Sequence, residues 1–393
     1  MKNVKQIAGI ALLTLCIGTT ISCNANTKPK KEITLATQAL VDTKKPEKNV
    51  VKVALLLDTS NSMDGLINQA KAQLWDIVNK FSYVKCGNEV RPELQIALYE
   101  YGNSTIEKQD GYIRQVINFS NDLDEISEKL FSLTTNGGDE YCGEAISTSI
   151  KNLDWGTNPD NLKMIFIAGN EPFNQGKLDY KDATSDAKEK GIVVNTIFCG
   201  DYNQGANSHW KNGAQLTGGE YIAINHNKKV IHIDTPYDDV IITLNKKLNK
   251  TYVSYGSLGS SKMALQSVQD DKAAEMEEAV MVKRAVSKSS RLYNNASWDL
   301  VDASKNKNFS VSKIDKKQLP KELQNKSTKE IEAFIETKEK QRKSIQQQIK
   351  EANTKREAYI AKNQKEGSKG ELENAMISAI VKQGKSKNYT WDK

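Results

Sequence analysis

The sequence contains few of the residues on which catalytic and redox sites usually depend. Its 393 residues include 3 histidines and 5 cysteines. No C-x-x-C pair and no cysteine–histidine cluster occurs, which argues against the common zinc and dithiol sites. None of His209, His226 and His232 follows a nucleophile-elbow pattern with a serine or cysteine. We therefore expect a protein that is not an enzyme.

Long apolar runs and basic–aromatic motifs are also scarce. After residue 23, no segment approaches the roughly 20 apolar residues that a membrane-spanning helix needs. The net charge of +7 is spread through lysine-rich stretches, without an interleaved aromatic motif for nucleic acid. Solvated helix faces explain this charge better than nucleic-acid binding does, so we expect no nucleic-acid partner.

The first 23 residues have the pattern of an export signal. Two lysines are followed by an almost uncharged apolar stretch, residues 7–21, which is short for a membrane span. The stretch closes on Ile21-Ser22-Cys23, which resembles a bacterial lipoprotein processing site. We expect residues 1–23 to be a lipoprotein signal peptide, with Cys23 lipidated at the start of the mature chain. Ordinary cleavage nearby, with loss of Cys23, is the alternative.

Residues 24–48 are polar and basic and show little periodicity. This composition is typical of a flexible tether. The signal and the tether together predict an exported, membrane-anchored protein at the bacterial envelope, facing the periplasm or the cell surface.

Residues 49–255 alternate between strand-like and helix-like segments. Apolar runs typical of strands occur at 50–57, 93–101, 113–119, 162–168, 192–198 and 220–224. Amphipathic or helix-forming stretches separate them, among others at 142–152, 178–189, 206–216 and 236–248. This alternation predicts an α/β fold with a doubly wound, mainly parallel sheet flanked by helices. Ligands of such folds bind at the carboxyl ends of the strands.

Residues 260–393 are rich in Lys and Glu and are predicted to be helical, with one helix over 262–290. A capping-box pattern at 327–330 opens an apolar stripe at roughly helical spacing. Lys338 and Arg342 interrupt the stripe, so the pattern of a coiled coil is irregular. A helical hairpin that packs on itself or on the first domain is the favoured interpretation, and a partner-binding helix is the alternative.

A set of oxygen-bearing side chains follows the first apolar strand. Residues 50–57 end in Asp58, and Ser60 and Ser62 come next at alternate positions. One carboxylate and two hydroxyls suit a hard cation such as Mg²⁺. The D-x-S-x-S pattern after a buried strand resembles the metal-ion-dependent adhesion site (MIDAS) of von Willebrand factor type A domains. Capping by the two serines of a helix that begins near Asp64 is the alternative.

The resemblance implies further ligands on two other loops. The second loop of the family carries Thr or Asp after a glycine pair, and here Asp139 follows Gly137 and Gly138. The resemblance therefore predicts a Mg²⁺ site, or one for Mn²⁺ or Ca²⁺, formed by the residues Asp58, Ser60, Ser62 and Asp139. Thr134 and Thr135, which precede the glycines, are weaker candidates.

The third loop departs from the family pattern. Gly169 stands where the family has an aspartate, and Asn170 or Glu171 would need a shifted loop to replace it. Cys142 and Cys199 fall at the same end of the predicted sheet, where a disulfide between them is one expectation and free thiols, with Cys86, are the other.

The resemblance also implies a function. An open coordination position on the cation would accept a carboxylate from a partner protein, so we expect divalent-dependent protein–protein recognition or adhesion at the envelope. The rival interpretation is a structural scaffold, in which the helical region binds the partner and the α/β domain has a degenerate metal site.

Overall fold

The computed structural model describes residues 49–86, 91–228, 232–363 and 371–391, which belong to one compact unit. The predicted signal peptide, Cys23 and the tether lie outside the described residues. Among the helices that the structure describes, none has the length and apolar character needed to cross a membrane.

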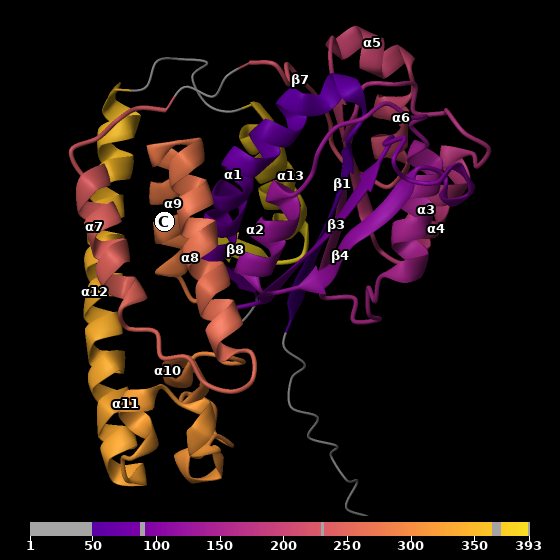
Figure 1. The fold of residues 1–393 in the computed structure, drawn as a ribbon. Coiled ribbons are helices and arrows are strands. Elements are labelled where there is room, and N and C mark those ends of the chain that lie inside the picture. The colour runs from indigo at the N-terminus through magenta and orange to yellow at the C-terminus, as the bar shows by residue number, and fades with distance from the viewer. Residues whose placement is uncertain (1–48, 87–90, 229–231, 364–370, 392–393) are drawn as a thin grey trace, which may run out of the picture. The chain divides into compact units, whose positions relative to one another are not determined.

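A six-stranded sheet forms the centre of the fold, in the strand order β4-β3-β1-β5-β6-β7 (Figure 1). The strands are β1 (Val50–Asp58), β3 (Glu93–Tyr101), β4 (Ile113–Ser120), β5 (Leu162–Gly169), β6 (Val193–Cys199) and β7 (Tyr221–Ile224). All neighbours pair in parallel except β4, which is antiparallel to β3. The predicted doubly wound, mainly parallel sheet is confirmed, and each predicted strand lies within one residue of its observed position.

Both faces of the sheet are covered by helices, as expected for a parallel sheet whose strands are apolar throughout. Along β1, Val53 and Leu55 enter one core, whereas Ala54 and Leu56 enter the core on the opposite face. The second face carries α3 (Cys142–Asn152), α4 (Tyr180–Glu189) and α6 (Trp210–Leu216), and short α5 (Tyr202–Asn207) precedes α6. The first face carries α1 (Asp64–Ser82), α2 (Leu123–Phe131) and α13 (Glu371–Ser386) (Figure 1).

The two faces exclude the disulfide that was one of the sequence expectations. Cys142 packs in the core beneath α3 and α4, whereas the Cys199 side chain lies in the core on the other side of the sheet. Both are free and buried, as is Cys86. The sequence placed both residues at one end of the sheet but did not show that they face opposite sides of it.

The remaining elements are the helices between β7 and α13, the short strands β2 and β8, and short 3-10 turns. They are α7 (Asp238–Asn249), α8 (Gly259–Met276), α9 (Glu278–Lys288), α10 (Leu300–Ala303), α11 (Lys321–Gln324), α12 (Thr328–Asn363), β2 (Val84–Cys86) and β8 (Tyr389–Trp391), with 3-10 turns at Asn61–Met63, Lys108–Asp110, Val311–Lys313 and Lys316–Gln318. The single helix predicted over 262–290 is two helices, because Glu277 has an extended backbone (φ −165°, ψ 147°) between α8 and α9.

The helical region packs on the first domain. Helix α12 lies along α7, and α13 returns to α1 and to strands β5, β6 and β7. Leu372, Met376 and Ile380 of α13 enter the same core as Phe166 and Ile197 of the sheet. The described part of the chain ends with β8, which pairs antiparallel with β2. Packing on the first domain, one of the two favoured arrangements, is therefore what the structure shows.

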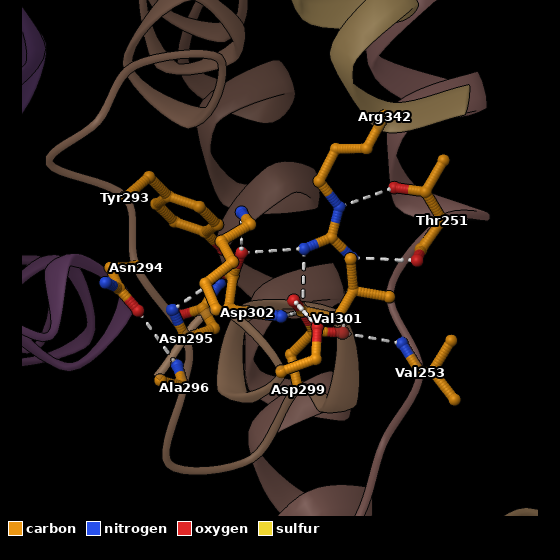
Figure 2. Close-up of polar contacts among 12 residues, drawn as sticks. Thr251, Val253, Tyr293, Asn294, Asn295, Ala296, Asp299, Val301, Asp302 and Arg342 are labelled. Atoms are coloured by element: carbon orange, nitrogen blue, oxygen red, sulfur yellow. Dashed lines mark hydrogen bonds and ion pairs between the residues drawn. The ribbon is translucent and has the colours of Figure 1, made fainter. Parts of the chain in front are cut away.

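Arg342, which interrupts the apolar stripe of α12, is an anchor of this packing (Figure 2). Its guanidinium is buried and donates to Asp299 (2.6 Å), to Asp302 (3.0 Å) and to the backbone oxygen of Thr251 (2.7 Å). It also lies 4.1 Å from the ring centre of Tyr252. From the sequence, an arginine at such a position is expected to face solvent, although here its side chain faces the core.

A second set of buried charges joins α8 and α9 to α2. Arg284 donates to Asp124 (2.7 Å) and to Asp270 (2.6 Å), and Lys288 also binds Asp270 (2.7 Å). The four side chains are nearly or fully inaccessible to solvent, and their formal charges cancel. Pairing of this kind is what makes buried charges tolerable.

Candidate metal centre

Asp58 occupies the centre of the predicted site, at the carboxyl end of β1. Its side chain is fully buried, and its Oδ1 accepts the backbone N–H of Ser60 at 2.7 Å. Its Oδ2 is buried and has no hydrogen-bond partner among the described residues. A buried carboxylate oxygen without a donor is costly, so it marks a place where a cation or a proton belongs.

The two serines and Asn170 lie next to this carboxylate. The hydroxyls of Ser60 and Ser62 are 3.4 Å apart, and the Asn170 amide donates to the Ser62 hydroxyl at 3.1 Å. The Asn170 Oδ1 is a further buried oxygen for which the described part of the chain offers no donor. Neither serine caps a helix, because the turn after Ser60 has no side-chain cap and α1 begins after Met63. The capping alternative is therefore wrong.

The acid that meets Asp58 is Glu140, the residue after the predicted Asp139. Glu140 is 5% exposed, and its Cγ lies beside the Asp58 carboxylate, since both crowd the position that a side chain on Gly102 would take. The Oε2 of Glu140 is also a buried oxygen without a partner in the described structure. Its backbone N–H donates to Gln175 at 2.9 Å, which fixes the segment at this position.

The other predicted ligands lie nearer to solvent. Asp139 is exposed and accepts a hydrogen bond from the Tyr141 hydroxyl at 2.9 Å. Thr135 donates its hydroxyl to Asp64, the first residue of α1. Glu171 is exposed, and its negative charge contributes to raising the pKa values of both Asp58 and Glu140. Thr134 is exposed and uses its backbone oxygen, which accepts from Asn103.

Burial and mutual repulsion disfavour ionisation of both carboxyls without a counter-charge. Burial, and then the neighbouring Asp58, raise the pKa of Glu140 far above its ordinary value. Burial also raises the pKa of Asp58, against the opposing effect of its contacts with Glu140 and Ser60. Two like charges in one buried site either share a proton or bind a cation.

Asn103 holds the loops of the site together and was missed by the sequence reasoning. Its buried amide donates to the backbone oxygen of Thr134 at 3.0 Å, while its oxygen accepts from the backbone N–H of Thr105 at 3.0 Å. Gly138 lets the same loops approach, because a Cβ there would lie 2.8 Å from the Gly102 oxygen. The only sequence signal for Asn103 is its position in the loop after β3. A loop position alone does not indicate that a side chain will join two loops.

Gly169, the departure from the family pattern, is explained by Tyr101. A Cβ on Gly169 would lie 2.4 Å from the Tyr101 hydroxyl and 3.1 Å from the Asp58 Oδ2. The Tyr101 hydroxyl donates instead to the backbone oxygen of Ala168 at 2.8 Å. The phenol therefore fills the space that an aspartate side chain would need, and the second acid of the site comes from the loop before α3.

The donor set fits a hard divalent cation. Among the described residues no three His, Cys, Asp or Glu side chains form a metal-holding group. Two carboxyls, two hydroxyls and an amide oxygen nevertheless lie next to one another. Three of these oxygens, on Asp58, Glu140 and Asn170, are buried and have no hydrogen-bond partner in the described structure. Oxygen sets of this composition suit Mg²⁺, Mn²⁺ or Ca²⁺ rather than a thiophilic metal.

Comparison with known families agrees with this fold. The model of the von Willebrand factor type A domain matches residues 52–216, so a domain of this type is present there. Such domains commonly bind a divalent metal at the MIDAS. The match begins in β1 and ends with α6, and it includes every residue of the candidate site.

Solved structures that are similar to part of this chain were also found. One is proximal thread matrix protein 1 from the mussel byssus, with a zinc-occupied MIDAS motif (15% identity, TM-score 0.36, 46% of this chain and 43% of that chain). Another is BatB from Bacteroides thetaiotaomicron (16% identity, TM-score 0.34, 44% of this chain and 90% of that chain). A third is the pilus adhesin SpaC from Lactobacillus rhamnosus GG (13% identity, TM-score 0.33, 45% and 28%).

The chain spans less than two thirds of the length of the mussel protein. A comparison with curated protein sequences finds no match.

Proposed function

We propose that this protein recognises a partner protein through a divalent cation held at the carboxyl end of the sheet. Asp58 and Glu140 supply the two carboxylates, Ser60 and Ser62 the hydroxyls, and Asn170 an amide oxygen. The observation that carries the proposal is the trio of buried, unpartnered oxygens on Asp58, Glu140 and Asn170. When bound, the cation supplies an open coordination position to which a carboxylate of the partner can bind.

The chain's own residues set the conditions for this binding. Asn103 and Gly138 keep the loops in register, and the exposed Glu171 adds negative charge that attracts a cation and repels an acidic partner until the cation binds. Burial of the two carboxyls strengthens their interaction with the ion, because water does not screen it there. The protein acts as a binding module and not as an enzyme.

Export to the bacterial envelope and lipidation at Cys23 complete the proposal. They rest on the sequence pattern of residues 1–23 alone, since these residues lie outside the described structure. A structural scaffold whose helical region binds the partner remains the competing function. The packing of α13 on the sheet weighs against a wholly separate helical module.

The test is capture of envelope proteins by the immobilised chain in Mg²⁺ and in EDTA. We expect bound proteins that EDTA releases and that the Asp58→Ala variant does not retain. The Lys340→Ala variant, changed on the exposed face of α12, serves as the control and is expected to retain them. Equal capture by the wild type and Asp58→Ala, with and without EDTA, would contradict metal-dependent recognition and favour the scaffold.

A further inference from the structure

Exposed acids lie on two sides of the candidate metal centre. Asp139 belongs to the loop before α3 and Glu171 to the loop after β5, and both residues are exposed. The first loop lies on the β3 side of β1, because a Cβ on Gly138 would contact the oxygen of Gly102, the residue after β3. Strand β5 pairs with the other edge of β1. The two acids therefore stand on either side of Asp58, which ends β1.

Basic side chains do not offset these two charges in the loops of the site. Three loops that meet there contain no lysine or arginine, namely residues 59–64, 134–141 and 170–176. The next cation along the chain, Lys177, lies beside Glu144 of α3, which accepts its backbone N–H at 2.7 Å. Asp139 accepts from the neutral Tyr141 hydroxyl, and neither it nor Glu171 forms an ion pair within the described part of the chain.

The charge of Glu171 reaches the metal centre. It contributes to raising the pKa values of both Asp58 and Glu140, as a nearby carboxylate does. A bound divalent cation offsets the charges of Asp58 and Glu140, whose unpartnered oxygens are buried, but it leaves those of Asp139 and Glu171. The open coordination position thus lies at the centre of a surface that is negative on both sides.

The backbone near each exposed acid is held by a neighbouring element. Trp210 of α6 donates its indole N–H to the backbone oxygen of Glu171 at 2.8 Å. On the other side, the backbone N–H of Asn136 donates to the oxygen of Thr59 at 2.9 Å, which ties the loop of Asp139 to the loop of the two serines. A partner therefore meets charges whose positions are set before it binds, which lowers the cost of ordering them.

We propose that the partner protein presents a carboxylate with lysine or arginine on both sides, so that the carboxylate binds the cation and the basic side chains lie beside Asp139 and Glu171. This inference rests on the proposed function and specifies the partner of that site. Neighbouring strands are about 4.8 Å apart, so loops on the two sides of β1 are about 10 Å apart. Basic residues two positions before and after the acid span about 13 Å in an extended segment, which is long enough to reach both. Acids in those positions would be repelled.

The test is binding of the purified full chain to immobilised peptides in saturating Mg²⁺. The probe Gly-Lys-Gly-Asp-Gly-Lys-Gly is compared with peptides that carry Gln or Glu in place of both lysines, and with one that carries Asn in place of Asp. We expect the lysine peptide to bind about threefold or more tightly than the glutamine peptide, and about tenfold or more tightly than the glutamate peptide. EDTA, or Asn in place of Asp, should abolish binding.

A matched pair of variants locates the origin of this preference. The double variant Asp139→Asn/Glu171→Gln removes the two charges and keeps the size of both side chains. It should bind the lysine and glutamine peptides equally in saturating Mg²⁺. The control Asp186→Asn/Glu189→Gln removes the same charge from exposed positions of α4 and should keep the preference of the wild type.

The outcomes separate this inference from the proposed function. Absence of Mg²⁺-dependent binding by every aspartate peptide would overturn both. Binding that needs Mg²⁺ and Asp but does not distinguish lysine from glutamine would leave the proposed function intact and overturn the inference, as would an equal loss of preference in both double variants. A preference for lysine that persists in EDTA would also overturn it, because attraction to the negative surface would then not involve the cation.

Discussion

At the scale of single residues, the pair Gly169 and Tyr101 sets which acids line the candidate metal site. Restoring the family residue with Gly169→Asp places a Cβ 2.4 Å from the Tyr101 hydroxyl. We expect the variant to lose about 1–3 kcal/mol of unfolding free energy, because the core around Asp58 is already filled. Urea denaturation measures this loss. Removing the hydroxyl in Gly169→Asp/Tyr101→Phe should recover part of it, and an unchanged stability of Gly169→Asp would contradict the explanation.

Glu140 makes the metal-free chain sensitive to pH. Its pKa is raised on folding, so the folded chain binds a proton that the unfolded chain releases. The stability that this proton provides is present below the ordinary glutamate pKa and declines as the pH rises toward the raised value. In EDTA, we expect Glu140→Gln to be more stable than the wild type by about 2 kcal/mol at pH 8 and similar to it at pH 4.5.

Urea denaturation at the two pH values checks this sign. Adding Mg²⁺ at pH 8 should stabilise the wild type and leave Glu140→Gln nearly unchanged, since only the wild type has both carboxylates. A variant that is less stable than the wild type in EDTA at pH 8 would show that Glu140 is ionised and satisfied in the metal-free protein.

The sequence did not indicate which of two adjacent acids, Asp139 or Glu140, faces the site. Asp139 and Glu140 both follow the glycine pair, and the family pattern favours the first. In the structure Glu140 is buried beside Asp58, whereas Asp139 is exposed to solvent. Which of two neighbouring residues faces the site depends on the path of the loop, which Asn103 and Gly138 fix through contacts with another loop.

At the scale of elements, Arg342 connects α12 to the segment around α10. Replacing it with methionine leaves Asp299 buried without its cation, whereas Asp302 keeps its ion pair with Lys305 (Figure 2). We expect Arg342→Met to cost about 3–5 kcal/mol of unfolding free energy, the range for breaking a buried pair from one side. The control Lys340→Met removes an exposed cation of the same helix, which pairs with Glu336, and should cost less than about 0.5 kcal/mol.

Chemical denaturation of both variants distinguishes the loss of a buried ion pair from the loss of any one positive charge on the helix. Similar, small losses for the two variants would show that Arg342 contributes no more than a surface cation.

The burial of Arg342 also explains why the apolar stripe of α12 is interrupted in the sequence. Arg342 and Arg356 face inward and bind carboxylates, including Asp238 of α7 at 2.7 Å, so hydrophobicity alone did not reveal their side of the helix.

At the scale of the whole molecule, the strand positions were predictable from the sequence, but the packing of the C-terminal helix α13 on the sheet domain was not. Alternating apolar strands and amphipathic helices are local patterns, and they located β1 and β3–β7 nearly residue by residue. The packing of α13 on α1 and on β5–β7 joins segments about 150 to 320 residues apart in the chain. Nothing in the composition of residues 371–386 distinguishes a helix that closes a core from one that binds a partner.

Removal of residues 371–393 tests this long-range packing. The truncation exposes the core positions that Leu372, Met376 and Ile380 cover, and we expect it to cost about 5 kcal/mol or more of unfolding free energy. Thermal unfolding and binding of an apolar dye measure the loss and the exposed surface. An unchanged melting temperature without dye binding would show that α13 is dispensable to the core.

We propose that Asp58 and Glu140, and not Asp139, hold a divalent cation. Calorimetric titration of Mg²⁺ into the wild type, Glu140→Gln and Asp139→Asn tests it directly, since both variants replace a carboxylate with an amide of the same size. We expect Glu140→Gln to weaken Mg²⁺ binding at least tenfold, and Asp139→Asn to keep the affinity within threefold. The reverse order, or absence of Mg²⁺ binding by the wild type, would contradict it.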